Sequence, residues 1–370
     1  MRGLLLLLIS IALGFEVAAV EPAAADSCGC DGVSKTHWIG QLLHNNFRLN
    51  DSTVCYPAFP RFALKVYNWG DQTFNSYDKD YVVGTGKNWK LMGKSVNWME
   101  TNMLLFPEDE RLDMHSPLYS DAGLRLSFMA VSIGYMWNIN KLFSRPSSRQ
   151  TFDFTFTTSR FYITYQNITS DGGMIITRLG DYNDGRAFRY HFDDGSLNSK
   201  MAEGVFFFNH SRYSHAAAYS YSKYQLRSAG TALIGVGFVE QRMSMDFSGL
   251  PGDMLEYLPL ETKHYRSHYR SYNVMGGYSY NWALSPRRWL INVYGTTGMG
   301  YRQVFGTRNR THDVRSLISN NVNLSGAVVY NHRALFAALT ARMYGYFTYN
   351  SNFTRFYSSL SAQVSVGMRF

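Results

Sequence analysis

Ser214 and His215, with His210 and Arg212 close by, are the residues of this chain whose types most suggest nucleophilic catalysis. A serine nucleophile needs a histidine base within hydrogen-bonding reach and a third group that orients the base. Neighbours on a strand point to opposite faces, so Ser214 and His215 cannot pair there, and His210 would stand roughly 13 Å from Ser214 at about 3.3 Å per residue. Catalysis would need a partner from another strand, and we expect these side chains to make structural hydrogen bonds in the interior instead.

Other residue groups resemble metal-binding patterns only superficially. His264 and His268 are spaced as a ligand pair that would form only on a helix, and their surroundings suggest a loop that enters a strand. Residues 181–185 and 193–195 are rich in Asp and Gly, as calcium loops are, but lack the downstream glutamate. We therefore predict turns at these places, with no metal site and no cofactor.

The elements that must position these residues are clearest at the carboxyl terminus. Between Phe356 and Phe370, residues of one parity are largely apolar and residues of the other are polar. Because successive side chains on a strand point to opposite faces, this segment has an apolar wall and a polar wall. A strand of an outer-membrane β-barrel needs this arrangement, with lipid outside and water inside. We interpret the terminal Phe370 as a membrane-insertion signal.

The same alternation recurs in segments of about nine to eleven residues, the length that a tilted strand needs to cross a bilayer. Some neighbouring segments are joined by hairpin-length links, whereas residues 170–203 and 246–267 form long polar connections. Aromatic residues make up 16% of the chain and charged residues only 17%. The prediction is an all-β fold, a transmembrane antiparallel β-barrel of about 12 strands within a range of roughly 10–14. A soluble β-sandwich, in which the apolar parity would form the core, is the alternative.

The amino terminus has the pattern of an export signal. A basic start, an apolar run from Leu4 to Leu13 and small residues after it are typical of a secretory signal peptide, cleaved after Ala19 or Ala25. This run is too short for a membrane-spanning helix, which needs about 20 residues. We predict a signal peptide over 1–25, a periplasmic segment over 26–58 with a short amphipathic helix within 38–49, and a barrel over 59–370.

Cys28, Cys30 and Cys55 would reach an oxidising compartment after export. One disulfide is possible and leaves an odd thiol, but the sequence does not decide whether Cys55 takes part. Lipidation at Cys28 is an alternative, although Ala25-Asp26-Ser27 lacks the aliphatic residue that normally precedes such a site.

The segment 209–231 carries a family resemblance. It contains an aromatic-Ser-x-Ala-Ala run followed by Gln-x-x-Ser-Ala-Gly, and it resembles the central signature of a family of uncharacterised outer-membrane proteins from Bacteroidetes. Residues 77–82 and 277–282 are also similar, whereas Thr231 stands where the pattern has Ser. The resemblance implies an outer-membrane barrel but no activity or substrate. The signature residues are Arg212, Tyr213, Ser214, Ala216, Ala217, Gln225, Ser228, Ala229 and Gly230.

The polar parity of the strands supplies the residues that we expect to line the lumen. Together with a net charge of +9, they predict a mild anion preference. Basic residues are dispersed among aromatic ones, so we expect outer-membrane lipids, lipopolysaccharide and the outer-membrane assembly machinery as partners, and no nucleic acid. The oligomeric state is open. The predicted lumen-lining residues are Asn292, Arg302, Asn321, Asn323, Arg342, Tyr344, Gln363 and Arg369.

These features predict an outer-membrane protein that acts as a small-solute pore or as a structural surface protein, and not as an enzyme. Two alternatives stay open. The first is an outer-membrane enzyme that modifies lipids, and the second is a surface module whose long loops bind a partner. The sequence determines neither the solute or ligand nor whether the lumen is open or plugged.

Overall fold

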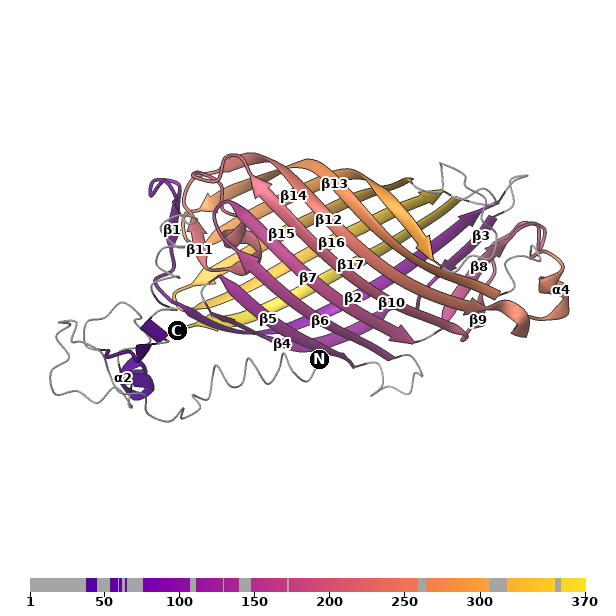
Figure 1. Ribbon diagram of the computed structural model, residues 1–370, viewed down its shortest axis with the longest axis horizontal. Helices are drawn as coiled ribbons and strands as arrows, with labels where there is room; N and C mark the ends of the chain where they lie inside the picture. Colours follow the sequence, from indigo (N-terminus) through magenta and orange to yellow (C-terminus); the bar gives the residue numbers. More distant parts are fainter. Residues whose placement is uncertain are drawn as a thin grey trace.

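The structure is a computed structural model (Figure 1). It describes residues 38–44, 54–58, 60–61, 64, 76–106, 111–128, 130–139, 148–171, 173–258, 264–305, 318–349 and 354–370. The signal peptide predicted for residues 1–25, Cys28 and Cys30 lie outside these residues. None of the described helices is long and apolar enough to cross a membrane.

Twelve antiparallel strands form a closed barrel (Figure 1). Each strand pairs with the next in the chain, apart from the short strands that lie outside the ring, and the last strand pairs with the first along Arg369↔Lys90 to Thr354↔Leu105. The predicted all-β barrel of about 12 strands is therefore confirmed. The barrel strands are β2 (Trp89–Leu105), β4 (Tyr119–Phe128), β5 (Val131–Asn138), β6 (Ser148–Thr157), β7 (Phe161–Asp171), β10 (Gly195–Phe207), β12 (Ala229–Asp246), β13 (His264–Ser285), β14 (Trp289–Phe305), β15 (Ile318–His332), β16 (Leu335–Tyr349) and β17 (Thr354–Arg369).

Alternation along each strand separates an apolar outer face from a mostly polar interior. On β13, for example, Val274 is 60% exposed while its neighbour Asn273 is 3% exposed. Other large outward side chains, such as Val236, Met299 and Leu339, are also exposed. This reversal of the usual soluble pattern is typical of transmembrane barrels and is inconsistent with a sandwich whose apolar parity forms the core.

The two ends of the barrel differ. At the short-turn end, tight links join β13 to β14 and β15 to β16, and the chain terminates there (Figure 1). Phe370 and Trp89 exchange backbone hydrogen bonds of 3.0 Å, so the terminal residue extends the closing seam between β17 and β2. At the opposite, long-loop end, connections such as that between β12 and β13 are longer.

The long-loop end carries an outer cap with its own apolar core. Three short strands, β3 (Arg111–His115), β8 (Met174–Leu179) and β9 (Tyr190–Phe192), continue the sheet from the end of β2. Their apolar side chains pack with the tips of β10 and β12, with the 3-10 turn η5 (Phe247–Gly249) and with α4 (Gly252–Leu255). We call β3, β8, β9, η5 and α4 the outer cap.

The amino-terminal region differs in part from the sequence prediction. Helix α2 (Trp38–His44) lies within the predicted 38–49, and Trp38 packs on Tyr56 with ring centroids 5.7 Å apart. The barrel begins at β2, later than the predicted boundary at residue 59, and the described residues among 58–64 are helical. Cys55 forms a disulfide whose partner lies outside the described residues.

Candidate functional site

The connection between β10 and β12 fills the short-turn end of the barrel, and we call residues 208–228 the plug (Figure 1). It contains the π-helix η4 (Ala216–Ser220) and the strand β11 (Lys223–Gln225), and every residue from Tyr213 to Tyr221 is buried. The run of three alanines has small side chains, which lets this helix pack closely on the barrel wall at Leu290, Ala327, Val329, Phe336 and Ala338. The plug therefore occupies space that water would fill in an open pore.

The structure corrects the assumption that Ser214 and His215 lie on a strand. Both lie in the turn that leads into η4. The Ser214 hydroxyl donates to the Tyr77 hydroxyl at 3.5 Å and accepts the Ala217 N–H at 3.2 Å. No histidine is among its described partners, so the two residues do not form a nucleophile and base pair.

His215 lies among aromatic rings instead. Its ring stacks on Phe207 and Tyr219, with centroids 5.1 Å and 4.6 Å away, and its Nδ1 lies 3.4 Å from the Tyr213 hydroxyl. Burial lowers the pKa of His215 from 6.5 to about 3, and the positive charge of Arg342 adds to this effect. The imidazole is therefore neutral and serves as a flat packing group at neutral pH.

Gln225 holds the two ends of the plug together and fixes them to the wall. Its Oε1 accepts the Ser214 N–H at 3.0 Å and the Asn281 amide of β13 at 3.0 Å. Its Nε2 donates to the carbonyl groups of Arg212 at 2.6 Å and Arg227 at 2.9 Å. Asn281 also donates to the Ser214 carbonyl at 3.0 Å. A single buried amide thus satisfies backbone groups that would otherwise be unpaired.

A second polar contact lies beside this one. The Tyr213 hydroxyl is 2.7 Å from the Ser279 hydroxyl on β13. Asn292 of β14 donates to the Ser279 hydroxyl at 3.0 Å and to the Asn281 side-chain oxygen at 2.8 Å. The predicted lumen residue Asn292 therefore belongs to the wall that receives the plug.

Two basic side chains from the closing seam hold the carboxyl end of η4. Arg369 of β17 donates from Nε to the Tyr221 carbonyl at 2.7 Å and also binds Asn331, and Lys90 of β2 donates to the Ser220 carbonyl. Both side chains are 1% exposed. Carbonyl groups at the end of a helix lack partners within the helix, and these N–H donors supply them.

Residues 76–84, which precede the barrel in the chain, complete the plug, and we call them the strap. Strand β1 (Val82–Gly84) pairs with β11, and the Asp78 N–H donates to the Ser211 carbonyl at 2.9 Å. The Tyr81 ring lies 5.1 Å from the Arg212 guanidinium and 5.7 Å from that of Arg227. The three segments that carry the family resemblance, 77–82, 209–231 and 277–282, therefore meet at one place in the structure.

The remaining signature residues lead from the plug into β12. The Ser228 hydroxyl accepts the Ala283 N–H at 3.1 Å. Ala229 begins β12 and is buried. At Gly230, a Cβ atom would approach the ring of Tyr280 to 2.6 Å, so the outward tyrosines pack closely over a position without a side chain.

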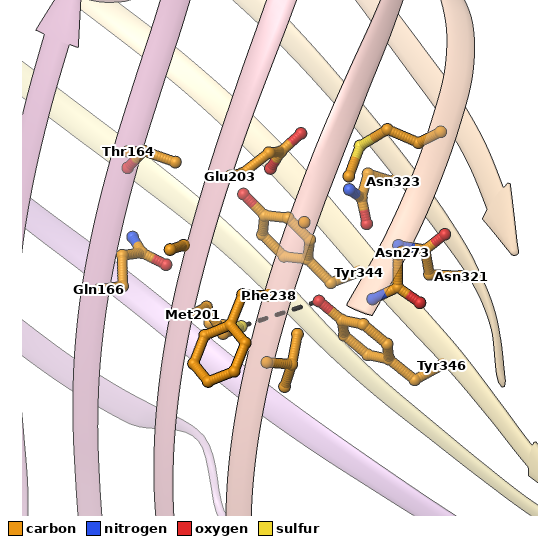
Figure 2. A pocket seen from close by; sticks show the side chains of 14 residues that line it. Thr164, Gln166, Met201, Glu203, Phe238, Asn273, Asn321, Asn323, Tyr344 and Tyr346 are labelled. Atoms are coloured by element: carbon orange, nitrogen blue, oxygen red, sulfur yellow. Dashed lines mark hydrogen bonds between the residues drawn. The ribbon is translucent and has the colours of Figure 1, made fainter. Parts of the chain in front are cut away.

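The other predicted lumen residues lie deeper in the barrel. Asn321, Asn323 and Tyr344 line a cavity of about 30 Å³ with Glu203 of β10 and Thr164 of β7 (Figure 2). A neighbouring cavity of about 20 Å³ lies between Tyr344 and side chains of several strands, among them Trp98, Tyr269, Tyr346 and Tyr357. Each cavity has room for one or two water molecules.

Arg302, Arg342 and Gln363 also face the interior. Arg302 donates to the Tyr349 carbonyl at 2.8 Å, Arg342 lies over the Tyr219 ring of the plug at 5.6 Å, and Gln363 donates to Ser365 at 2.8 Å. Arg302 and Arg342 therefore make packing and hydrogen-bonding contacts in the interior.

Sequence reasoning missed several charged residues of the interior. Lys90 anchors the plug, Arg125 of β4 forms an ion pair with Asp153 of β6, and Glu203 accepts the Tyr294 hydroxyl at 3.3 Å. The sequence pattern could have indicated Arg125 and Asp153 as interior residues, because each shares a parity with other polar residues of its strand. Among the described residues, no group of three or more His, Cys, Asp or Glu could hold a metal ion.

Residues 76–370 match a family described as a domain of unknown function, DUF4421. The chain belongs to this family. The match starts at the strap and includes the plug and the whole barrel. The family therefore covers the barrel together with the segments that fill it. The Bacteroidetes origin implied by the resemblance stays a prediction. No curated protein matches the chain.

Several solved outer-membrane barrels are similar in outline. OmpT of Vibrio cholerae is 5% identical, with a TM-score of 0.30, over 75% of this chain and 98% of that one. The outer membrane protease OmpT from Escherichia coli is 6% identical, with a TM-score of 0.34, over 80% and 98%. The translocator domain of the autotransporter NalP from Neisseria meningitidis is 10% identical, with a TM-score of 0.33, over 85% and 96%. These values carry no argument about function, and the fold rests on the strand pairing.

Proposed function

We propose that this chain is an outer-membrane β-barrel that is closed to solutes and serves as a structural surface protein. The exposed apolar outer face supports a position in a bilayer. The closed ring of strands supports it as well, because it leaves no unpaired strand edge in contact with lipid. The short-turn end would face the periplasm and the outer cap the cell surface, since barrels of this class have short periplasmic turns and long outer loops. The apolar run at Leu4–Leu13 supports export.

The observation that carries the closed state is the buried plug. It is held by Gln225, by Lys90 and Arg369 of the closing seam, and by the pairing of β1 with β11. Beyond it, the cavities around Tyr344 have volumes of only about 30 and 20 Å³. A solute larger than water would have to displace both the plug and these side chains, which favours a structural role over an open pore.

Conductance across a planar lipid bilayer tests this proposal. We expect no steady steps in the ionic current from the native protein. We expect steps from a variant in which residues 210–227 are replaced by a short Gly/Ser link and Tyr344 and Tyr346 by Ala, because both obstructions are then removed. Retention of the barrel in the variant is checked by heat-modifiable mobility on gels. Steady steps from the native protein would refute the closed state.

We also propose that the protein is not an enzyme. The contacts of Ser214 with Tyr77 and of His215 with aromatic rings support this, because neither group is arranged for proton transfer to the other. A change in the lipid profile of cells that lack the gene, measured by mass spectrometry and reversed by the native gene but not by a Ser214→Ala copy, would contradict this proposal.

A further inference from the structure

Four cationic side chains gather on the outer wall of the barrel near the long-loop end. They lie on three neighbouring strands, where Lys200 of β10 pairs with Glu240 of β12, and Glu240 pairs with Arg270 of β13. Arg242 and Arg266 follow on the same face, opposite His268 and Ser244 respectively. We call Lys200, Arg242, Arg266 and Arg270 the outer-wall cationic patch.

The patch lies directly beyond a row of outward aromatic residues. Phe238 pairs with Tyr272 and Tyr272 with Tyr301 across β12, β13 and β14, and the rings of Phe238 and Tyr272 are 5.4 Å apart. Such rows mark the boundary of the hydrocarbon region. Glu240 and Arg270 stand two residues further along their strands, about 7 Å away at 3.3–3.4 Å per residue. The polar layer of a bilayer extends roughly 5–7 Å beyond the hydrocarbon on each side, so the patch would lie level with the lipid head groups.

The patch has more positive charge than its own contacts neutralise. Glu240 lies 3.3 Å from the Arg242 guanidinium and 3.7 Å from that of Arg270, and it also contacts His268 at 3.2 Å. The side chain of Glu240 is 12% exposed, whereas those of Arg242 and Arg270 are 63% and 40% exposed. One carboxylate thus orients two guanidinium groups, and each keeps further N–H donors for an external ligand.

Packing also fixes Arg270. Its guanidinium lies over the ring of Phe305 on β14 at 5.1 Å. The patch does not extend to β15, β16 and β17, because the described outward side chains at the same end of these strands carry no charge. These uncharged side chains are Ile318, Asn320, Phe347, Tyr349, Thr354 and Phe356.

We infer that the outer-wall cationic patch binds the phosphate groups of a phosphorylated glycolipid in the leaflet around the long-loop end. The inference rests on the proposed outer-membrane position. Guanidinium groups bind phosphate through two parallel N–H donors, and Lys200 adds a point charge. The four cations span three strands, or about 10 Å at 4.7–4.9 Å between strands, so they can contact two phosphate groups at once. A glycolipid with two phosphates therefore binds more tightly than one with a single phosphate.

Native mass spectrometry of the folded protein in an uncharged detergent tests this. The probes are lipid A with two phosphates, lipid A with one, and fully dephosphorylated lipid A, and inorganic phosphate is added as a competitor in a separate arm. We expect one bound molecule of the two-phosphate lipid, weaker binding of the one-phosphate lipid and none of the dephosphorylated lipid. Free phosphate at millimolar concentration leaves most of the lipid bound, because the lipid tails also contact the apolar wall.

The decisive variant is Arg242→Gln with Arg270→Gln, and the matched control is Arg287→Gln with Arg288→Gln. The control removes the same charge from the exposed turn at the other end. We expect at least a tenfold loss of bound lipid in the first variant and no loss in the control. If the first variant does not fold, Lys200→Gln with Arg266→Gln replaces it, with the same expectation.

Equal binding by the patch variant and the native protein overturns the inference, and so does equal binding of dephosphorylated and phosphorylated lipid. If free phosphate displaces the bound lipid completely, the patch is an anion site without a lipid partner. That result also overturns the inference. These results are distinct from a failure of the proposed function, which appears as conductance of the native protein. If the protein stays folded and dispersed without detergent, this contradicts the position in a bilayer on which both proposals depend.

Discussion

Replacing Gln225 with Leu is the sharpest test of how the plug is held. The side chain makes hydrogen bonds of 2.6 to 3.0 Å with the Ser214 N–H, the Asn281 amide and the carbonyl groups of Arg212 and Arg227. Each is worth about 1 kcal/mol net. Leucine has a similar size and regains part of this by apolar packing, so we expect a loss of about 3 kcal/mol in the free energy that keeps the plug closed.

Hydrogen exchange followed by mass spectrometry measures this loss directly, because exchange of buried amides reports the free energy of local opening. A loss of about 3 kcal/mol raises the exchange rate of peptides from the plug roughly 150-fold. Peptides from β15 and β16, which Gln225 does not contact, keep their native rates. Gln303→Leu is the matched control, because Gln303 is exposed on the outer face of β14.

Exchange of the plug peptides within about threefold of the native rate would show that Gln225 does not hold the plug. Equal acceleration in the plug and in the barrel strands would also contradict the reasoning, because it would mean that the substitution loosens the whole barrel. The pattern of change therefore distinguishes a local fastening from a general contribution to stability.

Three further predictions concern the interior and the strap. Asp153→Asn leaves Arg125 without its ion-pair partner and should lower the free energy of unfolding in guanidinium by about 3 kcal/mol, a loss that a second substitution, Arg125→Met, should largely reverse. Because the folded state keeps His215 neutral while the unfolded state binds a proton below pH 6.5, its contribution to stability is present above that pH and is lost as the pH falls toward its lowered pKa of about 3. Between pH 7.5 and 5 the native protein should therefore lose about 2 kcal/mol more than His215→Phe, which titrates nowhere in this range, and equal losses would refute the shift. Tyr81→Leu removes two cation–π contacts, worth about 1 kcal/mol together, and should speed proteolytic cleavage of the strap without changing the barrel; an unchanged cleavage rate would count against the strap.

The sequence by itself determined the barrel. Period-two alternation is a local property, because each residue of a strand faces the side opposite to its neighbours whatever the strand pairs with. The segment from Phe356 to Phe370 could therefore be assigned an apolar outer and a polar inner face without knowledge of its partners. Lumen candidates such as Asn321 and Tyr344 follow from the same rule, and the structure places them on inward-facing positions around one cavity. The approximate number of strands follows from counting the alternating segments.

Tertiary structure alone decided what fills the barrel. The segment around Ser214 contains small, polar and aromatic residues, and this composition is compatible with a strand. It folds instead into a turn and a π-helix inside the lumen. This outcome depends on contacts with residues far away in sequence, since Lys90 and Arg369 supply partners for its carbonyl groups. The outer-wall cationic patch likewise exists only because the register aligns Lys200, Glu240 and Arg270. Alternation fixes which face a side chain takes, but register and loop packing fix its neighbours, and neighbours determine what a site can bind.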